Sequence, residues 1–342
     1  MDTKILQRIR ENLQRQRQNL FEWLSQTSPR TKKIHLGNAD EQAVAGHLQI
    51  LDEALGKANA HTLGLCNVCN EYVESSRVEM DFTACVCIDH YSAAERRKLE
   101  AELELAHKVQ KSLLPQAPPR IPRMQVAAFS QPAEIVSGDY YDFVRWRNGN
   151  HGFAIADVMG KGMPASLLMA SLQASLRILA PESDSPLAVM QRLNGLFCHN
   201  TQLIKFITLF LGSFEAQSGV LEYCNAGHNP PLLVRKNADG FMVKWLKPTG
   251  AAIGLVESFD FGFDRVQLEA GDVLLLYTDG LTEAMNAREE ELGEQRVVEL
   301  VQYHHRVLPH ELIHELRHAL REFTGKITLA DDFTLIAAKL MD

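Results

Sequence analysis

The chain has 342 residues, of which 46% are hydrophobic and 23% charged, and its formal net charge is -8. This length allows two domains of about 100–200 residues each, and the composition is that of ordinary soluble cores. The negative charge argues against a general nucleic-acid-binding protein. The N-terminus has no apolar signal region, and the chain has no run of about 18 apolar residues, so we expect a cytoplasmic protein that does not bind a membrane.

Three segments in the N-terminal third have the apolar spacing of amphipathic helices, at 3–26, 40–58 and 92–114. The first two are joined by a polar loop and predict a helical hairpin. The third has the pattern of a short coiled coil or of a helix that packs on its own domain. Four prolines within 115–122 end it and predict a linker. We therefore expect three parts, which are residues 1–91, 92–115 and 116–342.

Between the hairpin and the third helix lies a group of metal-binding residue types. Cys66 and Cys69 form a C-x2-C pair, and Cys87 and His90 form a second pair with the same internal spacing. Two short loops of this kind present four ligands in a tetrahedron around Zn²⁺, so the spacing predicts one structural zinc ion. Cys85 competes with these residues for a place in the site.

Residues 45–91 resemble the zinc finger of the DksA/TraR family, whose pattern is C-x2-C-x17-C-x2-C. The three cysteines named above match the first three ligands, and His90 replaces the last cysteine. Members of that family act on RNA polymerase through an acidic hairpin tip. Asp40 and Glu41 lie near the expected turn of the hairpin, so the resemblance implies RNA polymerase as one candidate partner.

The C-terminal part alternates short apolar runs with turn signals such as Arg147-Asn148-Gly149-Asn150. Closely spaced hairpins imply antiparallel sheets, so an α+β sandwich is favoured over a parallel α/β fold. The expected strands are 124–130, 140–147, 152–157, 207–214, 219–224, 231–236, 242–247, 263–268, 273–278 and 333–340. The expected helices are 164–180, 186–201, 294–303 and 309–323.

Four aspartates lie at the ends of these apolar runs, each beside a glycine or a second aspartate: Asp139, Asp157, Asp279 and Asp331. A carboxylate at such a position is costly to bury unless a cation or hydrogen-bond donors contact it. Several converging carboxylates without Cys or His select hard cations such as Mg²⁺ or Mn²⁺. Two such ions can activate water and hold a phosphoryl group, so the pattern indicates a two-metal hydrolytic site.

Residues 100–342 resemble the SpoIIE type of PPM serine/threonine phosphatase, the metal-dependent class related to protein phosphatase 2C. The resemblance implies an α-β-β-α fold, with helices outside two central antiparallel sheets, and two Mn²⁺ or Mg²⁺ ions. The motifs that carry it follow the family's order and are ELAHKVQKSLLP (104–115), VSGDYYDF (136–143), IADVMGKGMPASLLMA (155–170), YCNAGHNPPLL (223–233), LYTDGLTEAMN (276–286) and LADDFTLIAAKL (329–340).

The resemblance also implies roles for the aspartates. Asp139 and Asp157 would anchor the bridging metal site, and the Val158 carbonyl would contribute to one ion. Asp279 and Asp331 would complete the shell of the other ion. No aspartate of the motifs is missing, which favours an active enzyme.

Five further residues are candidates for supporting this site. Asp332 is either an additional ligand or a residue that positions the ligands, and Gly138 stands beside the first aspartate. Asp142 either hydrogen-bonds the site or caps a turn. Lys161 either steers phosphate or is a solvated loop residue. His228 is interpreted as structural rather than as a general acid.

The main hypothesis is a metal-dependent phosphoprotein phosphatase. Relatives often dephosphorylate a phosphoserine on a STAS-type anti-anti-sigma protein, under control of an N-terminal sensory or dimerisation region. The resemblance therefore implies a phosphoprotein substrate and a homodimer formed through the helix at 92–114, with the zinc domain receiving a partner or redox signal. The alternative is a zinc-finger adaptor of the transcription machinery whose phosphatase domain only binds partners.

Overall fold

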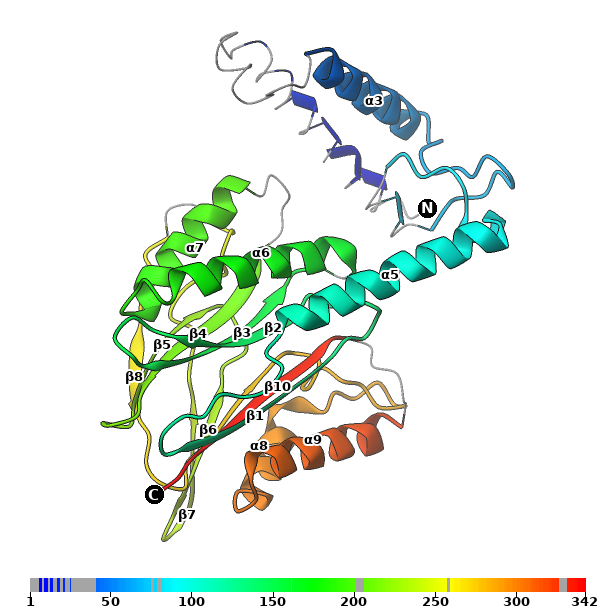
Figure 1. Ribbon diagram of the computed structural model, residues 1–342. Helices are drawn as coiled ribbons and strands as arrows, with labels where there is room; N and C mark the ends of the chain where they lie inside the picture. Colours follow the sequence, from blue (N-terminus) through cyan, green and yellow to red (C-terminus); the bar gives the residue numbers. More distant parts are fainter. Residues whose placement is uncertain are drawn as a thin grey trace. The chain divides into compact units, whose positions relative to one another are not determined.

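The computed structural model places the chain in two compact units, Met1–Ala101 and Glu102–Asp342 (Figure 1). The division lies inside the helix expected at 92–114, so the second half of that helix belongs to the C-terminal unit. The structure describes residues 6–7, 9–11, 13–14, 17–18, 21, 25, 41–74, 77–78, 82–160, 162–200, 206–256, 259–325 and 331–342.

The N-terminal unit has a small apolar core beside the cysteines that are candidate metal ligands. The described residues between 6 and 25 are helical, and α3 spans Glu41–Asn59. The rest of the expected helix at 3–26 and the loop to Asp40 lie outside the described residues. A short 3-10 helix, η1, spans Ile88–His90, and α5 spans Ala93–Leu113. The core contains Leu6, Ile9, Leu13, Leu51, Ala54, Leu55, Ala58, Leu63, Cys66, Val73 and Val78.

The C-terminal unit contains two antiparallel sheets, which confirms the expected α+β sandwich. The strand orders are β1-β10-β9-β6-β7 and β2-β3-β4-β5-β8. Their bounds are β1 Met124–Gln131, β2 Tyr140–Arg145, β3 His151–Val158, β4 Ile207–Glu215, β5 Val220–Ala226, β6 Leu232–Asn237, β7 Gly240–Trp245, β8 Asp264–Gln267, β9 Val273–Tyr277 and β10 Phe333–Leu340.

Helices cover the outer face of each sheet (Figure 1). The helices α6 (Met163–Leu179) and α7 (Pro186–Asn200) pack on the sheet that contains β3. The helices α8 (Gly293–Tyr303) and α9 (Pro309–Thr324) pack on the sheet that contains β10. One apolar cluster fills the space between the sheets, and one lies under each helical layer. The order of layers is therefore α-β-β-α.

Strand β2 is shorter than expected for a local reason. Strand β2 was expected to continue to residue 147 but ends at Arg145. The backbone N–H of Trp146 donates to the Asn150 carbonyl at 3.0 Å, and the N–H of Gly149 donates to the Trp146 carbonyl at 2.9 Å. Gly149 has a φ of 86°, which glycine adopts without strain, so the turn starts at Trp146.

Strand pairing brings the aspartate positions to strand ends within each sheet. Tyr140 pairs with Ala156, so Asp139 and Asp157 lie at the same end of β2 and β3. Leu335 pairs with Tyr277, which places the residues before β10 next to those after β9. Asp279 and Asp331 lie in these two segments. Each sheet thus has a pair of aspartates at the ends of two neighbouring strands.

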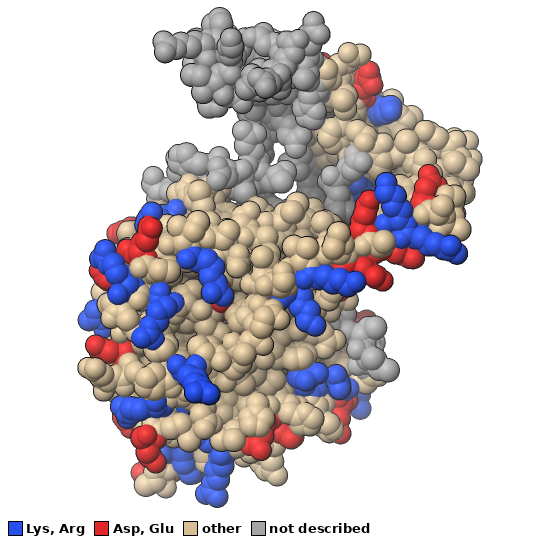
Figure 2. Space-filling model, in the orientation of Figure 1, with Lys and Arg blue, Asp and Glu red and all other residues tan. Residues whose placement is uncertain are grey.

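The visible surface carries charges of both signs. On the face of the C-terminal unit shown in Figure 2, basic and acidic side chains are interspersed around a largely uncharged middle and form no continuous basic area. This distribution gives no electrostatic reason to expect nucleic acid on that face. Among the described helices, none is long and apolar enough to cross a membrane.

Candidate metal centres

Two threonines connect the aspartates of the two sheets. The Thr278 hydroxyl donates to Oδ2 of Asp139 at 2.7 Å and accepts the backbone N–H of Thr334 at 3.0 Å. Asp139 precedes β2 in one sheet, whereas Thr278 and Thr334 belong to the edge of the other. Because Asp279 follows Thr278 directly, this bond holds Asp139 beside the segment that carries Asp279.

Asp332 forms hydrogen bonds with the backbone of the loop that carries Asp139. Its Oδ1 accepts the backbone N–H of Ala133, and its Oδ2 accepts the N–H of Gly138, both at 2.8 Å. Ser137 adds a further contact, since its hydroxyl accepts the N–H of Asp139 at 3.0 Å. Both carboxylate oxygens of Asp332 are thus engaged with backbone, which favours a positioning role for this residue over that of a metal ligand.

Two glycines allow backbone segments of the site to approach closely. A Cβ on Gly138 would lie 2.9 Å from the Val158 carbonyl oxygen, and a Cβ on Gly280 would lie 2.0 Å from the Asp332 carbonyl oxygen. Neither distance is compatible with a side chain unless the backbone moves. Gly138 therefore keeps the Val158 carbonyl next to the Asp139 loop, and Gly280 keeps the Asp279 loop against Asp332.

The surroundings of Asp139 disfavour a negative charge on its carboxyl group. Burial of Asp139, followed by the charge of Asp157, raises the pKa of its carboxyl well above the usual value, and the charge of Asp332 adds to this. Hydrogen bonds from Thr334 and Thr278 oppose the rise. A divalent cation would offset the repulsion between these carboxylates.

Glu283 belongs to the same acidic region and was missed by sequence reasoning. Desolvation raises its pKa, and the charges of Asp279, Glu291 and Asp331 raise it further. The effect shows that Asp279 and Asp331 share one electrostatic environment with Glu283. The only sequence signal was its position four residues after Asp279, inside the same motif.

The donor atoms of this region suit hard cations. They are carboxylates and a backbone carbonyl, without cysteine or histidine, and such sets prefer Mg²⁺ or Mn²⁺. Within the described ranges, the only group whose three or more candidate ligand atoms lie within 4.8 Å of one another is the Cys/His group of the N-terminal unit.

Asp142 does not take part in this region. It is fully buried in β2, where its Oδ2 accepts the Tyr140 hydroxyl and its Oδ1 accepts a guanidinium N–H of Arg177, both at 2.6 Å. Its Oδ1 also accepts the N–H of Phe143. The described contacts of Asp142 are thus with its own strand and with Arg177 of α6, whose side chain is 48% exposed.

His228 lies close to the acidic region but is neutral. Its side chain is buried, and its Nδ1 is 2.8 Å from the hydroxyl of Thr208, which pairs with Asp157 in the sheet. Burial lowers the pKa of His228 to about 3. An imidazole with this pKa is not in the imidazolium form that a general acid needs at neutral pH, which supports the structural interpretation. Lys161 lies outside the described residues.

Gln110 of α5 contacts the Asp139 loop; in the expected helix at 92–114 it lies on the apolar seam with Leu103, Ala106 and Leu113. Gln110 of α5 is buried, its Nε2 donates to the Ser137 carbonyl at 2.7 Å, and its Oε1 accepts the Ser137 N–H at 2.9 Å. Next to it, Nδ1 of His107 is 2.7 Å from the Ile135 carbonyl. A polar residue at an apolar seam position was the signal available in the sequence.

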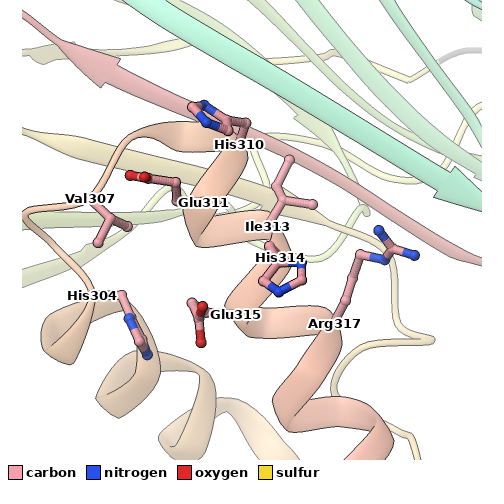
Figure 3. A pocket seen from close by; sticks show the side chains of 8 residues that line it. All are labelled: His304, Val307, His310, Glu311, Ile313, His314, Glu315 and Arg317. Atoms are coloured by element: carbon pink, nitrogen blue, oxygen red, sulfur yellow. The ribbon is translucent and has the colours of Figure 1, made fainter.

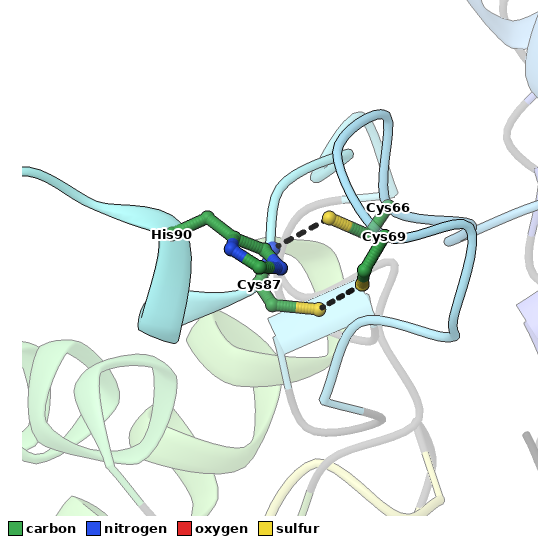
Figure 4. Close-up of side chains that lie close together, drawn as sticks. All are labelled: Cys66, Cys69, Cys87 and His90. Atoms are coloured by element: carbon green, nitrogen blue, oxygen red, sulfur yellow. Dashed lines mark hydrogen bonds between the residues drawn. The ribbon is translucent and has the colours of Figure 1, made fainter.

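The N-terminal unit brings together the four predicted zinc ligands (Figure 4). The ligand atoms of Cys66, Cys69, Cys87 and His90 all lie within 4.8 Å of one another. The sulfurs of Cys69 and Cys87 are 3.9 Å apart. Cys85 is not a member of this group, and its carbonyl instead accepts the N–H of Asn67.

The thiols of this group have pKa values shifted in opposite directions. Burial raises the pKa of Cys66, but backbone N–H groups of Cys69, Cys87 and Val68 outweigh it and lower the pKa to about 6. Burial and the neighbouring sulfurs of Cys66 and Cys69 raise the pKa of Cys87 to about 12. One thiolate is stabilised at the expense of another, and a bound cation would remove this conflict.

Comparison with known proteins identifies the C-terminal unit. The family model described as Stage II sporulation protein E (SpoIIE) matches residues 147–341. The chain belongs to the SpoIIE family. Its relatives include the phosphoserine phosphatase RsbU of Bacillus subtilis, which is 30% identical over 244 residues covering 71% of each protein. The phosphoserine phosphatase RsbP of the same organism is 29% identical over 184 residues, covering 53% of this chain and 45% of RsbP.

Solved structures of this kind share the fold. The PP2C domain of SiaA from Pseudomonas aeruginosa superposes with a TM-score of 0.64 at 23% identity, covering 72% of this chain and 99% of that domain. The phosphatase domain of SpoIIE from Bacillus subtilis, solved with a fragment of its regulatory domain, gives a TM-score of 0.53 at 20% identity, covering 64% of this chain and 63% of that one. The family match and the two phosphoserine phosphatase relatives show that the chain is a protein serine/threonine phosphatase.

Proposed function

We propose that the C-terminal unit hydrolyses phosphoserine or phosphothreonine on a protein, using two Mn²⁺ or Mg²⁺ ions. The proposed ligands are Asp139, Asp157, Asp279, Asp331 and the carbonyl of Val158. The observation that carries the proposal is the hydrogen bond from Thr278 to Asp139, which joins the aspartate-bearing edges of the two sheets.

Thr278, Asp332 and Gly138 are proposed to position the metal ligands. The ions, when bound, lower the pKa of a water molecule and offset the charge that develops on the phosphoryl oxygens. Thr278 orients the carboxylate of Asp139, and Asp332 holds the loop before it. Gly138 leaves room for the Val158 carbonyl to face the same space. The chain's residues therefore supply a fixed anionic frame.

A cysteine nucleophile is not part of the proposal. Cys224 is buried in β5, and burial together with the charge of Glu222 raises the pKa of its thiol to about 12. It is therefore protonated at neutral pH and enclosed by apolar residues. Attack by water, without a covalent phosphoenzyme, is consistent with this environment.

The similarity to RsbU and RsbP supports a phosphoserine protein as the substrate. Both relatives are named phosphoserine phosphatases. We infer that the substrate is a cytoplasmic signalling protein, a STAS-type antagonist of an anti-sigma factor or a similar protein. We therefore also propose that the enzyme acts in the cytoplasm.

The N-terminal unit is proposed as a DksA/TraR-like zinc domain that regulates the phosphatase. Its support is the grouping of Cys66, Cys69, Cys87 and His90. Helix α5 begins in the N-terminal unit and ends in the C-terminal unit, where Gln110 binds the Asp139 loop. A change in the helix could thus reach the metal site through a direct contact.

The proposed homodimer would form through α5. On the part of the helix that belongs to the C-terminal unit, Leu105 and Val109 are 61% and 53% exposed. They are four residues apart and therefore lie on one face. Gln110, which lies on the seam of the coiled-coil pattern, contacts the chain's own domain, so a dimer through α5 would use this other, exposed face.

The phosphatase proposal is tested with the full chain and a serine-phosphorylated STAS-domain protein. After removal of metals, no phosphate release is expected, and addition of Mn²⁺ or Mg²⁺ alone is expected to restore it. A phosphotyrosine form of the same protein serves as the control and should not be hydrolysed. Release of phosphate by the metal-free chain at the same rate would contradict the proposed site.

The zinc proposal is tested by measuring the metal content of matched variants. We expect one zinc ion per chain in the wild type and in Cys85→Ser, and none in Cys87→Ser, because only Cys87 belongs to the ligand group. Substitution with Co²⁺ should give thiolate charge-transfer absorption in the first two proteins. Loss of zinc from Cys85→Ser together with retention in Cys87→Ser would refute the ligand assignment.

A further inference from the structure

A cavity of about 570 Å³ lies on the outer face of the C-terminal unit, between the turn after α8 and the first turns of α9 (Figure 3). Three imidazoles line it, those of His304, His310 and His314. It is far from the aspartates. Lys339 of β10 contacts the turn at this end, and Asp331 is eight residues earlier, about 26 Å along an extended strand.

The sequence of α9 places histidines at the spacing that chelates metal ions. Residues 310–318 read HELIHELRH, which contains the pattern H-E-x-x-H twice. His310 and His314 are exposed, whereas Leu312 and Leu316 are buried against the sheet. Side chains four residues apart on a helix start about 5–6 Å from each other, so two imidazoles can bind one ion there.

The backbone on both sides of the cavity is fixed. The ammonium group of Lys339 donates to the carbonyls of His305, Arg306 and Val307 at 2.8, 2.9 and 3.1 Å, which fastens the turn. Helix α9 begins with Pro309 in its first turn, and the Leu308 N–H donates to Oε2 of Glu311 at 2.8 Å. Metal binding there would require only side-chain rotation.

The hydrogen bond from the Leu308 N–H to Glu311 argues against a second hydrolytic centre in this cavity. In zinc hydrolases with the H-E-x-x-H pattern, the glutamate acts as the general base. Here Glu311 is engaged by the Leu308 N–H at the start of the helix. His314 and His318, the histidines of the second copy of the pattern, are less suitable as a pair of metal ligands. His318 lies 3.5 Å from Glu322 and does not line the cavity.

We propose that His310 and His314 bind one divalent transition-metal ion of the Zn²⁺, Ni²⁺ or Cu²⁺ class in this cavity. Imidazole nitrogens prefer these ions to Mg²⁺ or Mn²⁺, so the site differs in selectivity from the aspartate region. Water completes the coordination shell, and the ion is exchangeable because only two protein ligands hold it. In Figure 3 the two rings project from successive turns, and exposed side chains of this kind change rotamer within nanoseconds.

The test uses the full, untagged chain with one equivalent of Zn²⁺ for the Cys/His group, in excess Mg²⁺ and with Ni²⁺ as the only added probe. Modification of histidines by diethylpyrocarbonate is followed by mass spectrometry. Ni²⁺ is expected to slow modification of His310 and His314 by about tenfold and to leave His318 unchanged, because coordination removes the nucleophilic nitrogen. Equal rates with and without Ni²⁺ at all three positions would overturn the proposal.

Matched variants give an independent readout by calorimetry. The double variant His310→Gln/His314→Gln is expected to lose one equivalent of Ni²⁺ binding, and His318→Gln is expected to retain it. All three side chains are exposed, so these changes should leave the fold intact. Unchanged Ni²⁺ binding in the double variant, or its loss in His318→Gln, would reject the assignment.

Discussion

Replacement of Asp139 by asparagine is expected to lower kcat/KM for a phosphoprotein by about 10³-fold or more, because the change removes the negative charge of a carboxylate that would hold the metal ions. Asparagine has nearly the same shape and can still accept the hydrogen bond from Thr278. The fold should therefore remain intact. The measurement is phosphate release at saturating Mn²⁺, together with the thermal midpoint of unfolding.

The same variant is expected to be more stable than the wild type when metals are absent. The pKa of Asp139 is raised in the folded chain, first by burial and then by Asp157. A carboxyl with a raised pKa costs stability as pH rises from its unfolded value, about 3.9, through its folded value. The stability advantage of asparagine should thus be largest at neutral pH and disappear in acid. Added Mn²⁺ should stabilise only the wild type.

Asp272 provides the matched control, since it is also a buried aspartate. It accepts two hydrogen bonds from the guanidinium of Arg235, at 2.8 and 2.7 Å, and lies away from the acidic region. Asp272→Asn is expected to destabilise the fold by about 3–5 kcal/mol, because it breaks a buried ion pair, while kcat is unchanged. If both variants lose stability and neither loses activity, Asp139 is a structural residue and the proposed site is wrong.

The local part of the fold could be predicted from the sequence because the signals are local. The hairpin between β2 and β3 follows from the Asn148-Gly149 turn, and its strands end within a few residues of the predicted limits. The pairing of β1 with β10 is different. It joins Met124 to Leu340, and no pattern within a short window specifies a contact between such distant segments.

The same distinction applies to the site. Asp139 and Asp142 belong to one motif and look equivalent in the sequence, yet only Asp139 reaches the acidic region. What separates them is the partner of each, Thr278 for Asp139 and Arg177 for Asp142. Both partners are distant in the chain, so the motif alone could not assign the roles. The grouping of Cys66, Cys69, Cys87 and His90 could be predicted because short spacing within a loop restricts their geometry.

Gln110 provides the second strong prediction, because it connects the helix that enters from the N-terminal unit to the Asp139 loop. Its two hydrogen bonds satisfy both backbone groups of Ser137, a residue that is 5% exposed. Gln110→Ala would leave these groups without partners, at about 1–3 kcal/mol each. The loop would then shift, and Gly138 and Asp139, which directly follow Ser137, would move with it. Because misplacement of a catalytic group by about 1 Å can cost 10²-fold, kcat/KM should fall by about 10–100-fold.

The control for Gln110 is Gln116, which lies beyond the end of the same helix. Its side chain donates to the carbonyls of Lys111 and Leu114 and touches no part of the acidic region. Gln116→Ala should therefore leave kcat/KM and amide exchange of residues 135–139 unchanged, whereas Gln110→Ala should accelerate that exchange. Were Gln110→Ala to keep full activity with protected amides at 135–139, α5 would only pack on the phosphatase domain, and a signal from the zinc domain would need another route.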